Sequence, residues 1–154
     1  PELAANLIEI RKAAAIVLIV DGQRVAEPRT RAGVFASVRN IARALVGSGD
    51  IGPQTRIQLV TTKCDLLMGD GTADALEALT EFEANLAALL DGKFPLATFR
   101  TAARDPDGNV APASGMDRLL QSWISPSSSS HLEEPELPVL VSEFDRLLLR
   151  GSRS

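Results

Sequence analysis

The sequence is short of several residue types, and each shortage narrows what the chain can be. Its 154 residues include no tyrosine and one tryptophan, and aromatic residues make up 4%, so the core must be built from small aliphatic side chains. The lone cysteine, Cys64, excludes an internal disulfide framework and fits a reducing compartment. The lone histidine, His131, has no cysteine, aspartate or second histidine arranged around it. Neither a histidine-based metal site nor a Ser/His/acid hydrolase is therefore expected.

Long apolar segments and runs of basic residues are absent as well. The longest apolar run covers residues 13–20, far short of the roughly 20 residues that a membrane-spanning helix needs. No signal-peptide pattern is present. The 16 basic and 20 acidic residues give a net charge of −4, which argues against a nucleic acid or an anionic membrane as partner. We therefore expect a cytoplasmic protein without a membrane span.

What remains is an ordinary globular composition with alternating helix and strand patterns. Apolar residues make up 45% and charged residues 23%, and the length suits one domain with a real core. Apolar spacing predicts helices over 2–12, 29–46, 73–90 and 114–123, and strands over 13–20, 56–60 and 94–100. This alternation predicts an α/β fold with three α/β/α layers and a parallel sheet. The unbroken apolar run 13–20 predicts a strand buried on both faces.

The chain divides into three parts by composition. Residues 1–124 carry the alternating pattern, residues 125–138 form a linker rich in serine and proline, and residues 139–154 form a terminal helix and tail. Asp21 is expected to be a turn and helix-entry residue rather than a metal ligand, since no partner carboxylate stands at useful spacing. We expect three arginines to form a solvated helix face: Arg31, Arg39 and Arg43.

Polar loops follow two of the predicted strands, and ligands bind at such strand ends in open parallel sheets. Guanine presents N1–H and an exocyclic amine side by side, and an ionised carboxylate accepts both hydrogen bonds. Asp65, after strand 56–60, is placed to do this, and Lys63 projects to the same side, where its stem would cover the flat face of the purine. A backbone N–H in the small-residue loop 101–103 would meet the guanine carbonyl, O6.

These loops resemble the guanine-recognition motifs of P-loop GTPases of the small-GTPase and translation-factor class. Segment 62–65, Thr-Lys-Cys-Asp, resembles the Asn/Thr-Lys-x-Asp motif, and segment 101–104, Thr-Ala-Ala-Arg, resembles Thr-Ser-Ala-Lys. Over residues 1–124 the chain is similar to the C-terminal half of such a domain, in a version found within larger bacterial multidomain proteins. The resemblance implies GTP or GDP as ligand and six guanine-binding residues: Thr62, Lys63, Asp65, Thr101, Ala102 and Ala103.

The chain also departs from this family pattern. Thr62 replaces the usual asparagine with a shorter side chain, and Ala102 replaces a serine and so removes a hydroxyl. No Gly-x-x-x-x-Gly-Lys-Ser/Thr motif occurs, and no Asp-x-x-Gly loop precedes strand 13–20. These elements bind phosphate and Mg²⁺ and support hydrolysis in the family, so the chain alone is not expected to hydrolyse GTP.

Two functions stay open at this point. In the first, further sequence upstream supplies the missing strands and the phosphate and Mg²⁺ chemistry, and the present chain supplies base recognition in a molecular switch. Its partners would be a guanine nucleotide and either a protein or further domains of a longer chain. In the second, the chain is a nucleotide-free, GTPase-like module for protein interaction or scaffolding.

Overall fold

The computed structural model describes residues 13–49, 51–52, 54–104, 108 and 110–124. The helix predicted over 2–12, the linker 125–138 and the terminal helix and tail 139–154 lie outside the described residues. The elements in chain order are β1 (Ala15–Asp21), α2 (Gly22–Ala26), α3 (Pro28–Ser48), β2 (Arg56–Thr62), the short 3-10 helix η1 (Cys64–Leu67), α4 (Ala73–Leu90), β3 (Leu96–Arg100) and α5 (Met116–Ile124).

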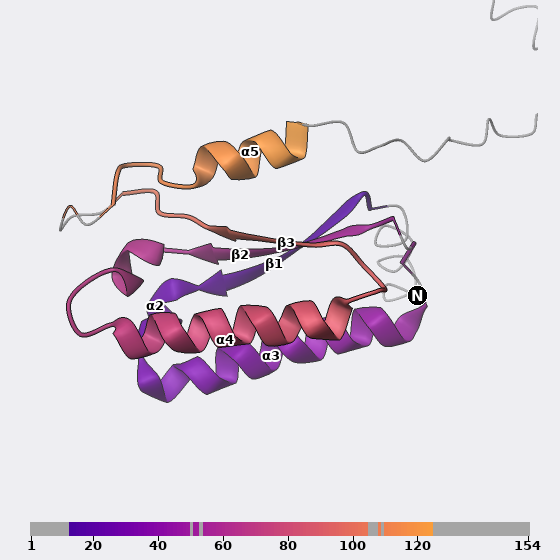
Figure 1. The fold of residues 1–154 in the computed structure, drawn as a ribbon, viewed down its shortest axis with the longest axis horizontal. Helices are drawn as coiled ribbons and strands as arrows, with labels where there is room; N and C mark the ends of the chain where they lie inside the picture. The colour runs from indigo at the N-terminus through magenta and orange to yellow at the C-terminus, as the bar shows by residue number, and fades with distance from the viewer. Residues whose placement is uncertain (1–12, 50, 53, 105–107, 109, 125–154) are drawn as a thin grey trace, which may run out of the picture.

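The strands form one parallel sheet in the order β1-β2-β3. Helices α3 and α4 run along one face of the sheet, and α5 lies over the opposite face (Figure 1). This arrangement confirms the predicted α/β fold with a parallel sheet between helical layers. None of the helices in the described part of the chain is long and apolar enough to cross a membrane.

The register brings the ends of all the strands to one edge of the sheet. Asp21, the last residue of β1, pairs with Thr62, the last residue of β2. Thr61 pairs with Arg100, the last residue of β3. The loops that follow β2 and β3 therefore start side by side, and helix α2 starts next to them.

The main core lies between the sheet and helices α3 and α4. Ile57 and Leu59 of β2 are fully buried on this face, and the aromatic rings of Phe35 and Phe82 stack between the two helices with centroids 4.4 Å apart. Helix α4 begins and ends at the predicted residues, and its apolar stripe is buried at four positions: Leu79, Phe82, Leu86 and Leu90. Packing of the apolar side chains of α3 and α4 against the sheet holds the two helices on this face.

Strand β1 corrects the expectation of burial on both faces. Leu18 and Val20 are buried toward α3, but Val17 is 36% exposed and Ile19 is 66% exposed. The strand lies at the edge of the described sheet, and α5 is hydrogen-bonded to residues of β2 instead of covering β1. A continuous apolar run could not reveal that only one of its faces is covered within the described chain.

Helix α5, which overlaps the helix predicted over 114–123, buries little of its apolar surface. Only Leu119 is buried, whereas Leu120 is 46% exposed and Trp123 is 51% exposed. The helix is instead held by a polar contact: Trp123 Nε1 donates to Gln58 Oε1 at 2.8 Å, and Gln58 Nε2 donates to Ser122 Oγ at 3.1 Å. Because Gln58 is 1% exposed, these bonds satisfy an amide that would otherwise be buried unpaired.

The arginine face of α3 is only partly solvated. Arg43 is exposed as expected, but the Arg31 side chain is 15% exposed. Its Nε donates to the Val25 carbonyl at 2.7 Å, and its Nη1 pairs with the Asp74 carboxylate at 3.2 Å. Arg31 therefore ties α3 to α2 and to the start of α4, a long-range role that helical periodicity does not reveal.

Strand β2 extends two residues beyond its predicted end, because Thr61 and Thr62 pair with Val20 and Asp21 of β1. This places the Thr61 side chain in the interior, where its hydroxyl has no hydrogen-bond partner among the described residues. An unpaired buried hydroxyl costs about 1–3 kcal/mol.

We expect Thr61→Val to raise the free energy of unfolding by about 1 kcal/mol, because valine keeps the shape and removes the unpaired group. Thr101→Val is the matched control, since the Thr101 hydroxyl is also buried but donates to the Thr61 carbonyl at 3.4 Å. Urea unfolding of both variants measures the difference. A loss of stability in Thr61→Val would show that its hydroxyl is satisfied in solution.

Candidate functional site

The loops after β2 and β3 contact each other directly. The Thr101 N–H donates to the Thr61 carbonyl at 2.8 Å, and the Cys64 N–H donates to the Thr101 carbonyl at 3.0 Å. The two segments that the sequence singles out, 62–65 and 101–103, are therefore fastened together at the C-terminal edge of the sheet.

Lys63 turns the chain from β2 into η1. Its φ of 50° lies in the left-handed region, which costs a non-glycine residue about 1–2 kcal/mol. The turn directs the next residues inward, so Cys64 is 3% exposed and Asp65 is 8% exposed, and Leu67 anchors the end of η1 at 1% exposed. The strain sits at the loop where the sequence predicts recognition, as is common at binding sites.

The Asp65 side chain is buried and unpaired. No described donor hydrogen-bonds or ion-pairs with its carboxylate, although η1 uses the Asp65 carbonyl to accept the Met68 N–H at 3.1 Å. Buried carboxylates are ordinarily paired or hydrogen-bonded, because an unpaired buried charge is costly. The Asp65 carboxylate is thus available to a ligand that brings its own donors.

Loop 101–103 presents a backbone donor. Ala102 is buried, and its N–H donates to the Ser114 carbonyl at 3.0 Å. The Ala103 carbonyl accepts the Ala113 N–H at 3.1 Å, while Ala103 is an exposed residue whose N–H has no acceptor among the described residues. The loop is fixed on both sides, and one amide is left for a ligand.

The remaining predicted residues support the loops. Thr101 is 4% exposed and bonds to Thr61 through both its backbone and its hydroxyl. The Thr62 hydroxyl donates to the Val20 carbonyl at 3.4 Å, a long bond that ties the loop to β1. Burial raises the pKa of the Cys64 thiol, and the neighbouring Asp65 charge adds to the shift, so the thiol stays protonated at neutral pH.

Two residues that sequence reasoning did not assign to the site contact Lys63. The Lys63 ammonium lies 3.3 Å from the Asp21 carboxylate and 3.0 Å from Gln23 Oε1. Asp21 also caps α2 by accepting the Gln23 N–H at 3.1 Å, which confirms its predicted helix-entry role. Strand pairing could have suggested Asp21 as a neighbour of the loop, but Gln23 depends on the short helix α2, which the pattern did not predict.

Gly22 brings the backbone of α2 against the same loop. A Cβ at this position would overlap the Thr62 carbonyl oxygen and would lie 2.7 Å from the Lys63 carbonyl oxygen. Only glycine permits this close approach. Residues 21–23 therefore support the Lys63 turn through both backbone and side chains.

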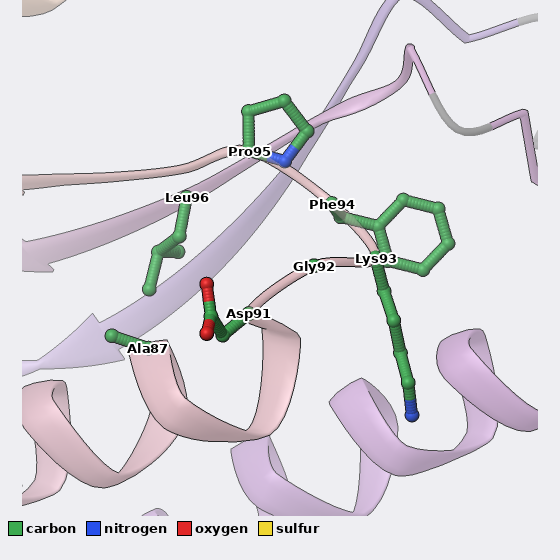
Figure 2. A pocket seen from close by; sticks show the side chains of 7 residues that line it. All are labelled: Ala87, Asp91, Gly92, Lys93, Phe94, Pro95 and Leu96. Carbon is green, nitrogen blue, oxygen red and sulfur yellow. The ribbon is translucent and has the colours of Figure 1, made fainter.

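A cavity of about 440 Å³ lies at the other end of the sheet, where α4 leads into β3. Figure 2 shows the Asp91 carboxylate beside Leu96 and Ala87, whereas the Lys93 ammonium points away from them. The polar groups do not converge, so this cavity lacks the arrangement of a specific ligand site. Nor does any group of three or more His, Cys, Asp or Glu side chains in the described ranges have the geometry to hold a metal ion.

Comparison with known protein families gives a match. The model of the family described as Double-GTPase 2 (DO-GTPase2) matches residues 1–124, which include every described strand and both loops. No curated protein and no solved structure gives a match.

Proposed function

This chain belongs to the Double-GTPase 2 family and carries a GTPase-like α/β domain, and from that premise we propose that the C-terminal edge of its sheet binds the base of a guanine nucleotide. Asp65 accepts hydrogen bonds from N1–H and the exocyclic amine, and the Ala103 N–H donates to O6. The Lys63 stem covers one face of the purine. Three residues hold the two loops in place: Thr62, Thr101 and Ala102.

The unpaired carboxylate of Asp65 carries this proposal. The residue is 8% exposed and no described donor hydrogen-bonds to its carboxylate, while neither carboxylate oxygen is fully enclosed. Guanine supplies two adjacent donors in the plane of one edge, which matches a carboxylate in a bidentate, charge-assisted contact. Adenine presents no such pair, so it would leave the carboxylate buried and unsatisfied.

The ligand in this proposal is GTP or GDP, and the domain is part of a cytoplasmic guanine-nucleotide switch. The loop residues bind the base alone. Among the described residues, no group of three or more His, Cys, Asp or Glu side chains could hold the Mg²⁺ that the family implies.

A nucleotide-free interaction module is the competing function. Exposed apolar side chains on β1 and α3 favour it, since Ile19 is 66% exposed and Ile41 is 51% exposed. Contiguous apolar surface of this kind often marks a contact with another protein.

Titration of the full-length protein with a fluorescent GDP analogue separates the two functions. We expect GDP and GTP to compete at least about 100-fold better than ADP and ATP, because only guanine satisfies the buried carboxylate. Asp65→Ala should abolish binding, while Asp70→Ala, a change of an exposed aspartate in the neighbouring turn, should leave it unchanged. A folded wild-type protein that binds neither base would support the interaction module instead.

A further inference from the structure

We propose that Asp21 and Gln23 are positioning residues of the guanine site, which hold the Lys63 ammonium so that its stem stays over the base. This inference rests on the proposed function. It adds to the site the turn of residues 21–23, which follows β1 and lies far in sequence from loops 62–65 and 101–103.

The contacts at the tip of Lys63 carry the inference. Asp21 and Gln23, which flank Gly22, approach the ammonium at 3.3 Å and 3.0 Å. The Lys63 side chain is 49% exposed, so it has little packing to restrain it along its length. A lysine side chain has many accessible rotamers, and two acceptors at its tip remove much of that freedom before a ligand arrives.

The acceptors are themselves held in place. Asp21 is fixed by its capping bond to the Gln23 N–H, and helix α2 is anchored by Val25, which is 0% exposed. Gly22 packs against the carbonyls of residues 62 and 63, so the backbone of Lys63 rests on the same turn that holds its ammonium. Both ends of the lysine are therefore positioned by residues 21–23.

The chemical consequence concerns which part of Lys63 acts on the nucleotide. Its charge is occupied by Asp21 and Gln23, so the methylene stem, rather than the ammonium, is presented to the ligand. Lys63→Met retains an apolar stem of similar length and removes the tethered charge. In this variant Asp21 and Gln23 have no ammonium to bind, so they can no longer affect how the stem lies over the base.

A double-mutant cycle with the fluorescent GDP analogue tests this coupling. We expect Asp21→Asn to weaken affinity about threefold to fivefold, the scale of a partly exposed ion pair, and this effect should shrink at high salt. Thermal stability should not change, because asparagine caps a helix as well as aspartate does. Gln23→Met should weaken affinity about twofold, with little salt dependence, because the acceptor that it removes from the Lys63 ammonium is uncharged.

In the Lys63→Met background, neither change should alter affinity further. The positioning role would be overturned if Asp21→Asn bound the analogue as tightly as wild type. It would also be overturned if Asp21→Asn lowered affinity equally in the wild-type and Lys63→Met backgrounds. If the folded wild-type protein binds no guanine nucleotide, the proposed function fails and the positioning role fails with it. If the wild type binds and Asp65→Ala does not, an inert Asp21 refutes the positioning role alone.

Discussion

Asp65→Asn is expected to lower guanine-nucleotide affinity by at least about 100-fold and to create binding of xanthine nucleotides. Asparagine presents one acceptor and one donor group where aspartate presents two acceptors. Guanine then meets a donor with its own amine and loses a hydrogen bond inside a buried site. Xanthine carries a carbonyl in place of that amine, so it complements the asparagine amide.

Competition of GDP and XDP against fluorescent analogues of both nucleotides, on wild type and variant, measures this exchange. Asp70→Asn makes the same chemical change at an exposed position and should leave the preference for guanine intact. The assignment of Asp65 to the base would be wrong if Asp65→Asn bound GDP as tightly as wild type. Retained folding of the variant, checked by circular dichroism, excludes loss of structure as the cause.

Gly115→Ala is expected to cost about 2–5 kcal/mol of stability, the sum of backbone strain and overpacking. Gly115 has a φ of 71°, and a Cβ there would overlap the Arg100 carbonyl oxygen and lie 3.2 Å from its carbonyl carbon. The backbone carbonyl at the end of β3 has little room to move. The neighbouring Ser114 carbonyl holds the Ala102 N–H, so loop 101–103 should shift as well.

Gly71→Ala separates the cost of backbone strain from the cost of overpacking. Gly71 has a φ of 80°, but a Cβ there would meet no heavy atom within 4 Å. Its replacement should therefore cost only the strain, about 1–2 kcal/mol. Denaturant unfolding of both variants gives the comparison, and equal losses would show that the contact with Arg100 carries no penalty.

Local sequence patterns were sufficient to predict much of the fold. Helix α4 was predicted at its observed residues because an unbroken helical stripe runs from Ala73 to Leu90 between turn residues. The placement of Asp65 and of loop 101–103 at one edge followed from parallel strands alone, since such strands end together. These features depend on neighbours in sequence or on rules of sheet topology.

Features set by contacts between distant segments were not predictable. The exposure of Ile19 depends on which helix covers which strand, and the partial exposure of Trp123 depends on its hydrogen bond to Gln58 across the sheet. The left-handed turn at Lys63 is an exception to the preferences of its residue type, and the approach of Gly22 explains how it is accommodated. Sequence could predict which residues bind the base but could not show which contacts hold their loops in place.

The hydrogen bonds that fasten the two recognition loops also bear on the thermodynamics of binding. Cys64 is bonded to Thr101 and Thr101 to Thr61 through backbone hydrogen bonds, so under the proposed function the base would meet two loops that are already fastened together. Ordering a mobile loop consumes part of the interaction energy of most ligands. Under the proposed function that loss is small on the protein side, and the proposed contacts of Asp65 and Ala103 with the base contribute more fully to affinity.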